Sequence, residues 1–175
     1  MAIDSPVGRL TVSATEDAVV AIAWADDPHG EPTGLLVEAG RQLDAYFARR
    51  LNCFDLPLMP AGSTFEQRVW EAMRQIPHGE TRSYGELAME VGSAPRAIGR
   101  ACGRNPIPIV IPCHRVLARN GPGGYSGGTG LATKHALLAL EGAATPLLAL
   151  RGRRSDPRGS EPAATGISAS RHSSQ

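Results

Sequence analysis

Cys113 lies in the stretch IPCHRV, residues 111–116, between a proline and a histidine. A thiol at this place could fill the core, bind a metal or act as a nucleophile. The thiolate is the reactive form, so a nucleophile needs a base or a positive charge nearby, and His114 and Arg115 follow directly. Adjacent side chains of an extended segment point to opposite faces, however, and an unreactive buried thiol is the commoner fate after an apolar run. These six residues alone therefore favour core filler and leave the nucleophile open.

The other cysteines, Cys53 and Cys102, make the total odd and give no disulfide-framework spacing, which is typical of a reducing compartment. No CxxC motif occurs, and the five histidines do not pair with the cysteines at zinc-finger spacing, so we expect no metal and no cofactor. No apolar stretch reaches the roughly 18 residues of a membrane span, and the first ten residues lack a signal-peptide layout. We expect a cytoplasmic protein that makes no membrane contact.

The chain of 175 residues is 42% hydrophobic, which suffices for one well-buried domain or two small ones. Its net charge of +1 conceals an asymmetry, because residues 1–60 hold nine acids and four bases, whereas residues 61–150 hold six acids and nine bases. Five arginines and no acid lie between Val91 and Arg119. This local charge indicates either a polyanion partner or a solvated basic helix face.

Two apolar, β-branched runs at residues 8–15 and 18–25 predict a hairpin, and the apolar spacing of residues 34–51 predicts a helix. Residues 1–60 therefore form a small α/β amino-terminal domain, followed by a Pro- and Gly-containing boundary. Residues 61–150 form the second domain. Residues 151–175 contain almost no large apolar side chain, so they are expected to be a disordered basic tail.

The second domain begins with two capping patterns, each of which opens a helix: Ser63 or Thr64 ahead of Glu66 and Gln67, and Ser83 with Glu86. Pro95 suits the first position of a third helix, which must end before the pair Asn105–Pro106. Two short helices joined by a tight Gly-containing turn are typical of a helix-turn-helix. A glycine-rich loop, residues 118–130, and an amphipathic helix ending at Gly142 follow.

The predicted second helix of this motif carries Arg96, Arg100 and Arg104 on one face, and its remaining residues are unusually small. Gly99 and Gly103 each cost a helix roughly 1 kcal/mol relative to alanine. Their presence indicates close approach to another surface, which could be a partner molecule or a neighbouring helix.

The chain resembles the O6-alkylguanine-DNA alkyltransferases in three stretches read together, RAIGRACGRNPIPIVIPCHRV, GGYSGG and KHALLALEG. The resemblance is strong from Phe65 to Gly142 and weak over the first 60 residues. The resemblance implies a ribonuclease H-like amino-terminal domain and a mainly helical, winged-helix-like DNA-binding domain that contains the helix-turn-helix. It also implies a monomer that repairs duplex DNA containing O6-alkylguanine, and it leaves open whether O4-alkylthymine is a second substrate. The base is flipped out of the stack, and its alkyl group passes irreversibly to the protein's own cysteine.

The resemblance also implies catalytic roles. Cys113 matches the alkyl acceptor, His114 the base that takes its proton through a water, and Glu141 the acid that orients the histidine. Asn105 matches a residue that braces the turn before the active-site strand, which we expect the apolar run to form. Tyr84 matches the tyrosine that helps to rotate the nucleotide and donates a hydrogen bond to the departing guanine.

Contacts with DNA follow from the same resemblance. Arg96 matches a finger that fills the space left by the flipped base, while Ala97, Gly99 and their small neighbours would let the helix enter the narrow minor groove. Arg100, Arg104 or Arg119 would bind phosphates. Pocket positions are matched by Pro108, Val116, Tyr125 and Ser126. Cys102 stands near this pocket, either as a second thiol or in a packing role.

Three other hypotheses compete with this one. A non-catalytic alkyltransferase-like protein that flags lesions would carry tryptophan in place of Cys113. A DNA-binding regulator would leave Cys113, His114 and Glu141 unexplained, and a thiol hydrolase would need a substrate groove that the sequence does not indicate.

Overall fold

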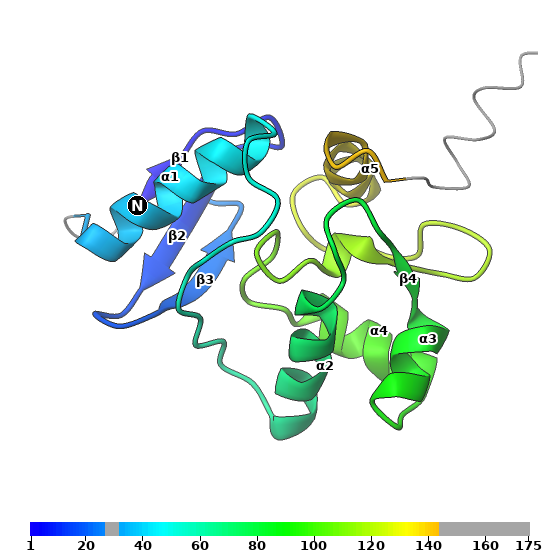
Figure 1. The fold of residues 1–175 in the computed structure, drawn as a ribbon. Helices are drawn as coiled ribbons and strands as arrows, with labels where there is room; N and C mark the ends of the chain where they lie inside the picture. The colour runs from blue at the N-terminus through cyan, green and yellow to red at the C-terminus, as the bar shows by residue number, and fades with distance from the viewer. Residues whose placement is uncertain (27–31, 144–175) are drawn as a thin grey trace, which may run out of the picture.

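The computed structural model describes residues 1–26 and 32–143 (Figure 1). The predicted tail, residues 151–175, lies outside the described residues, as does the end of the predicted second domain. Within the described part, a small α/β unit and a mainly helical part lie side by side, joined by an extended segment between α1 and α2 (Figure 1).

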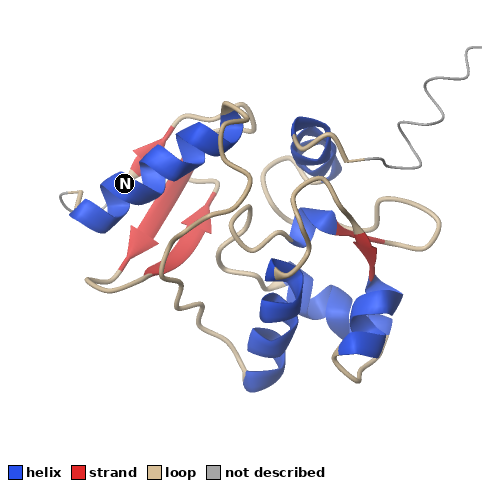
Figure 2. Ribbon diagram, viewed as in Figure 1, coloured by secondary structure: helices blue, strands red, loops and turns tan. Residues whose placement is uncertain are grey.

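The amino-terminal unit is an antiparallel sheet with one helix over its face (Figures 1 and 2). Strands β1 (Ala2–Ile3), β2 (Leu10–Ala14) and β3 (Val19–Ala23) are in sequential order, and β2 and β3 form the predicted hairpin. Helix α1 (Gly34–Phe47) confirms the predicted helix and begins at Thr33, whose side chain accepts a hydrogen bond from the backbone N–H of Leu36.

Both predicted capping boxes open helices in the second part. Ser63 and Glu66 begin α2 (Thr64–Arg74), and Ser83 and Glu86 begin α3 (Tyr84–Glu90). Helix α4 (Pro95–Gly103) starts at the predicted proline and packs against α3, which confirms the helix-turn-helix arrangement. The indole N–H of Trp70, on α2, donates to the carbonyl of Ala101 at 2.9 Å. This bond holds α4 against α2.

The active-site segment differs from the prediction. We expected the apolar run, residues 107–111, to be a strand, but it makes only an isolated bridge, and Cys113–Arg115 form one turn of 3-10 helix, η1. Pro106, Pro108 and Pro112 have no backbone N–H to give to a ladder, and Ile109 has a φ of +76°, which a strand does not allow. Buried apolar side chains fix the segment instead.

Strand β5 (Val116–Leu117) follows η1 directly and pairs in parallel with β4 (Arg82–Ser83). Because Tyr84 comes immediately after β4, this short pairing brings the start of the helix-turn-helix beside the cysteine turn. Helix α5 (Leu131–Leu140) then follows the glycine-rich loop, and Gly142, with a φ of +70°, allows the chain to turn away after it.

One hydrophobic core joins the two parts. Its fully buried side chains include Leu10 and Leu43 from the amino-terminal unit and Trp70, Ile98 and Leu137 from the helical part. The backbone N–H of Ile22, in β3, also donates to the carbonyl of Pro106 at 2.8 Å. The amino-terminal unit is therefore packed against the segment that leads into the cysteine turn.

Candidate active site

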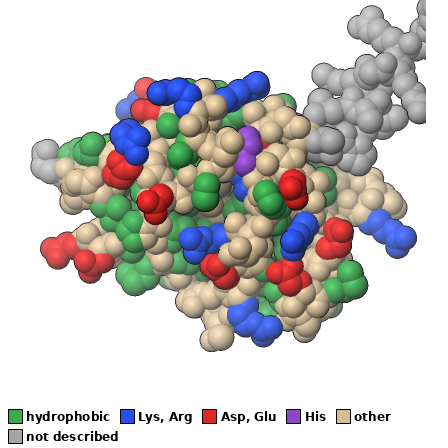
Figure 3. Space-filling model, in the orientation of Figure 1, with side chains coloured by type: hydrophobic (Ala, Val, Ile, Leu, Met, Phe, Trp, Pro, Cys, Tyr) green, Lys and Arg blue, Asp and Glu red, His purple; other side chains and the backbone are tan. Residues whose placement is uncertain are grey.

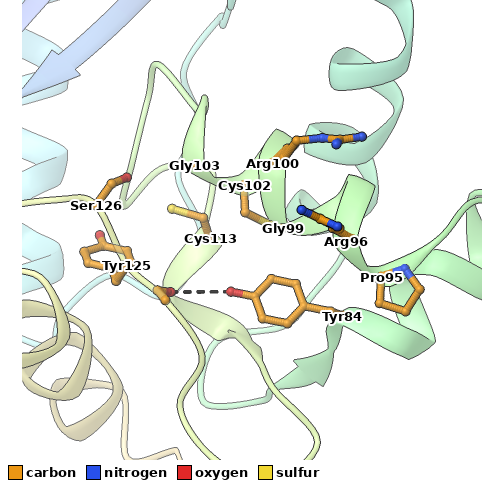
Figure 4. Close-up of a pocket in the computed structure, with 11 residues that line it drawn as sticks. Tyr84, Pro95, Arg96, Gly99, Arg100, Cys102, Gly103, Cys113, Tyr125 and Ser126 are labelled. Carbon is orange, nitrogen blue, oxygen red and sulfur yellow. Dashed lines mark hydrogen bonds between the residues drawn. The ribbon is translucent and has the colours of Figure 1, made fainter.

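Cys113 lines a cavity of about 570 Å³ beside α4 and the start of α3 (Figure 4). Tyr84, Arg96 and Arg100 border it on one side of the thiol, and Tyr125 and Ser126 on the other. The volume falls in the range of small-ligand pockets. The structure thus brings together, around one thiol, residues that lie more than 40 positions apart in the sequence.

The Cys113 side chain is only 7% exposed, and burial raises the pKa of its thiol. Asn105, the Lys134 cation and the Tyr125 hydroxyl oppose that shift because each stabilises the thiolate. The site therefore keeps Cys113 protonated at rest and holds the groups that favour its charged form close by. Such a thiol needs a partner that accepts its proton.

The next residue, His114, has a ring nitrogen that can accept a proton. Its Nε2 lies 2.8 Å from Glu141 Oε1, and because the carboxylate can only accept, Nε2 carries the proton. The other ring nitrogen, Nδ1, is buried and makes no hydrogen bond within the part of the chain that the structure describes. Burial lowers the pKa of His114 despite Glu141, so the ring is neutral and Nδ1 has a lone pair free for a proton.

Glu141 caps the end of α5 and receives five hydrogen bonds. Besides His114, the donors are Arg115 through Nε and Nη2, each at 2.9 Å, the Tyr46 hydroxyl at 2.7 Å and the Gly79 backbone N–H at 3.3 Å. Burial alone would raise the pKa of Glu141, but His114 and Arg115 outweigh it and hold the pKa well below its usual range. Arg115 neutralises the carboxylate, and the carboxylate fixes the orientation of the imidazole.

Sequence reasoning missed Tyr46 and Lys134. Tyr46 belongs to α1, 95 residues from Glu141, and no local sequence pattern predicts their contact. Lys134 is completely buried, donates to the carbonyl of Val116 at 2.6 Å and lies 6.0 Å from the centre of the Tyr84 ring. Burial lowers the pKa of Lys134 to about 8. A signal existed for this residue, because Lys134, Leu138 and Glu141 share one face of α5.

Tyr84 projects its ring into the cavity, and its hydroxyl donates to the carbonyl of Gly124 at 3.4 Å (Figure 4). Burial, with the nearby thiols of Cys102 and Cys113, raises the pKa of Tyr84 to about 12. The phenol is therefore protonated at neutral pH and can donate a hydrogen bond to an atom in the cavity.

The two glycines of α4 face open space. An added Cβ on Gly103 would meet no atom within 4 Å, and one on Gly99 would meet only the edge of the Tyr84 ring, at 4.0 Å. Tight packing against a neighbouring helix therefore does not account for these glycines. Their helix-destabilising effect fits close approach of a second molecule to this face.

The three arginines that were predicted to share this face differ in their surroundings. Arg96 and Arg100 line the cavity mouth (Figure 4). Arg104 instead forms an ion pair with Glu66 on α2, at 3.0 Å, although most of its side chain is exposed. On the face shown in Figure 3, acidic and basic side chains are interspersed, without a single basic patch.

Asn105 braces the turn between α4 and the cysteine segment. Its side-chain amide donates to the carbonyl of Ile111 at 2.8 Å and accepts from the backbone N–H of Ile107 at 3.0 Å. The predicted bracing contacts are thus present, and the same side chain also favours the Cys113 thiolate.

The predicted pocket positions separate into two groups. Tyr125 and Ser126 line the cavity, whereas Pro108 and Val116 are buried and are not among the described residues at its wall. Val116 contributes instead through its carbonyl, which accepts the hydrogen bond from Lys134. Ala97, the other small helix residue expected to face DNA, also lies outside the lining.

Cys102 lines the same cavity, with its sulfur 3.5 Å from that of Met73. Burial and the neighbouring Cys113 raise the pKa of Cys102 to about 12, and no histidine hydrogen-bonds to it among the described residues. This second thiol therefore stays protonated. Within residues 1–26 and 32–143, no group of histidine, cysteine or acidic side chains has the arrangement of a metal site, and no helix is long and apolar enough to cross a membrane.

Comparison with known proteins identifies the family. A family described as 6-O-methylguanine DNA methyltransferase, DNA binding domain, matches residues 64–143, and its ribonuclease-like domain matches residues 2–60. A methylated-DNA–protein-cysteine methyltransferase of Methanosarcina barkeri is 51% identical over 150 residues, covering 79% of this chain and 94% of the relative.

Two solved structures from Mycobacterium tuberculosis have the same architecture. The O6-methylguanine methyltransferase has a TM-score of 0.72 at 42% identity, covering 86% of this chain and 96% of its own. A structure described as OGT in complex with DNA has a TM-score of 0.72 at 43% identity, covering 83% and 95%. With a small amino-terminal domain and a helical DNA-binding domain that contains the cysteine turn, this chain belongs to the 6-O-methylguanine DNA methyltransferase family.

Proposed function

We propose that this protein repairs DNA by moving the alkyl group of O6-alkylguanine onto Cys113, in a single irreversible turnover. The observation that carries the proposal is that Cys113 lines a cavity beside α4 and is followed directly by His114, whose ring is hydrogen-bonded to Glu141 and keeps Nδ1 unpaired within the described residues. The family supports DNA as the partner, since a similar structure is described in complex with DNA.

The transfer proceeds as a displacement at carbon. The Cys113 proton passes to His114 Nδ1 through an intervening water, and the imidazolium that forms is stabilised by Glu141. The thiolate then attacks the alkyl carbon, so that a carbon–sulfur bond forms while the carbon–oxygen bond breaks. Guanine leaves with the electron pair, and the product is a thioether with no route back to a thiol.

The protonated hydroxyl of Tyr84 donates a hydrogen bond to the departing guanine as negative charge develops on the base. The Lys134 cation, held on the carbonyl of Val116, contributes a positive field on the same side. Neither group needs to move far, because β4 and α5 fix both.

The target base must leave the duplex to reach Cys113, because the O6 substituent is stacked between its neighbours. Arg96 stands at the mouth of the cavity, where it can enter the gap that the flipped base leaves. Arg100 and the exposed Arg119 supply phosphate contacts, and Gly99 and Gly103 let the backbone of α4 approach a narrow groove.

The finer features of the family are part of the same proposal. The amino-terminal unit is a reduced ribonuclease H-like domain, and the β4–β5 pair with the helix-turn-helix is a winged-helix-like arrangement. The protein acts as a monomer in the cytoplasm, where its cysteines remain thiols, and it needs no metal or cofactor.

The test is to incubate the protein with duplex DNA containing O6-methylguanine, digest it and locate the methyl group by mass spectrometry. One methyl group on the Cys113 peptide is expected, with the Cys102 peptide unmodified as the internal control because that thiol lacks a base. Cys113→Ala should bind the DNA and take up no methyl group. Methyl-free Cys113 with retained DNA binding would instead indicate a lesion-flagging protein.

The finger role has its own test. Arg96→Ala should slow transfer from duplex DNA much more than transfer from a single-stranded oligonucleotide that carries the same lesion, since only the duplex needs its gap filled. Equal slowing of the two reactions would exclude this role for Arg96.

A further inference from the structure

Trp24 stands immediately after β3 in the amino-terminal unit, outside the cavity, and no step of the proposed reaction uses it. Its indole N–H donates to the carbonyl of Val7 at 2.9 Å. The backbone beside it is fixed as well, because Ala23 pairs with Thr11, whose hydroxyl donates to the carbonyl of Ala25 at 2.6 Å. The ring is thus held rigidly by the amino-terminal sheet.

The free side of this ring lies against the backbone of the glycine-rich loop. A Cβ placed on Gly127 would lie 2.5 Å from one ring carbon of Trp24, and one on Gly128 would lie 2.9 Å from its indole nitrogen. The ring also meets Tyr125 edge to face, with 6.3 Å between centroids and 84° between planes. The loop can rest on the indole only where it has no side chain.

This contact matters because the loop forms one wall of the cavity. Gly124, Tyr125 and Ser126 line it, and the Tyr125 hydroxyl favours the Cys113 thiolate. Six of the 13 residues from Ala118 to Gly130 are glycines, so ordering the loop costs more backbone entropy than usual. Lys134 and Tyr84 hold it at Gly124, and Thr133 holds it at Thr129. Trp24 holds the stretch between those points.

We propose that Trp24 is a positioning residue through which the amino-terminal unit sets the wall of the alkylguanine pocket, by holding the loop at Gly127 and so fixing Tyr125 beside Cys113. The expected effect on the placement of the base rests on the proposed function. The contact between Trp24 and the loop does not depend on that function. Trp24 itself touches neither substrate nor thiol and acts only through the loop.

Trp24→Ala should slow transfer between about tenfold and about a hundredfold, the range expected when a reacting group is misplaced by up to about 1 Å. The loss should be equal for duplex and single-stranded O6-methylguanine substrates, and the DNA dissociation constant should not change, because α4 is untouched. Trp24→Phe keeps a ring over Gly127 and should recover most of the rate.

The decisive experiment is a double-mutant cycle with Gly127→Ala. In the presence of Trp24 the new methyl group meets the ring, so the loop must shift and transfer should slow strongly. In the Trp24→Ala background that clash is absent, so Gly127→Ala should cost much less, although Tyr125 still lies near the added carbon. Gly121→Ala is the matched control, since nothing lies within 4 Å of its added carbon, and its effect should be the same in both backgrounds.

Hydrogen exchange of the loop gives a readout that needs no alkyl transfer. Amides of residues 123–130 should exchange faster in Trp24→Ala, while those of α4 stay as in the wild type. A wild-type protein that takes up no methyl group would overturn the proposed function, yet the exchange result would still test the contact. Unchanged loop exchange, or equal costs of Gly127→Ala in the two backgrounds, would overturn the role of Trp24.

Discussion

Tyr46→Phe removes one oxygen from the amino-terminal unit and is the sharpest probe of how that unit supports the His114–Glu141 pair. The Tyr46 hydroxyl is buried and lies 2.7 Å from Glu141 Oε1, the same oxygen that receives His114 Nε2. A hydrogen bond to a charged group contributes about 1.5–3 kcal/mol. Since phenylalanine preserves the packing of the ring, we expect the free energy of unfolding to fall by about that amount.

The effect on the reaction should be smaller and should depend on pH. Without Tyr46, less of the negative charge of Glu141 is compensated, so the pKa of His114 should rise toward its ordinary value. Arg115 still holds both carboxylate oxygens, so the imidazole keeps its orientation. Transfer at pH 8 should therefore change less than about threefold, whereas the acid limb of the pH–rate profile should move upward in pH.

The assay is urea unfolding with a cycle through Glu141→Gln. If Tyr46 acts through the carboxylate, Tyr46→Phe should cost at least about 1 kcal/mol less in the Glu141→Gln background. Tyr84→Phe is the matched control, because its hydroxyl makes only a 3.4 Å contact, and it should reduce the transfer rate with little loss of stability. An unchanged unfolding free energy in Tyr46→Phe, or strict additivity with Glu141→Gln, would refute the reasoning.

Three further predictions follow from the charges of the site. Lys134→Met should slow transfer at least about tenfold in a methyl-transfer assay, because it removes the buried cation that favours the Cys113 thiolate. Arg104→Ala should weaken DNA binding less than Arg100→Ala does, with a smaller change in salt slope, because Arg104 is paired with Glu66. The pKa of His114 is lowered from 6.5, so below about pH 6.5 the unfolded chain binds a proton that the folded protein does not. Unfolding free energies should therefore decline as pH falls from about 6.5, and His114→Gln should lack this part of the decline.

Much of the local structure was predictable because it depends on near neighbours. The capping boxes at Ser63 and Ser83 and the proline at the start of α4 each satisfy or remove backbone donors within one turn. The hairpin of the amino-terminal sheet followed from β-branched runs. The prediction of a strand before Cys113 was wrong because apolar composition does not supply the partner strand that a ladder needs. Pro108 within the segment, and Pro106 and Pro112 beside it, also lack the backbone N–H of a ladder.

The residues of the site divide in the same way. Cys113, His114, Glu141 and Asn105 were identified from short motifs, and the structure places them together. Tyr46 and Trp24 were not predictable, since each acts across more than 90 residues of chain, and a contact of that separation leaves no periodic trace in the sequence.

The sequence by itself indicated the candidate side chains for the chemistry and determined which helix carries small residues and arginines, because motif spacing and helical periodicity are local properties. Only the tertiary structure decided the states of those groups. Burial, and the neighbours that the fold supplies, decide whether Cys113 is charged and which nitrogen of His114 is free. They also decide that Arg104 is paired whereas Arg96 lines the cavity. Desolvation and hydrogen bonding act over a few ångströms in space, whatever the distance along the chain.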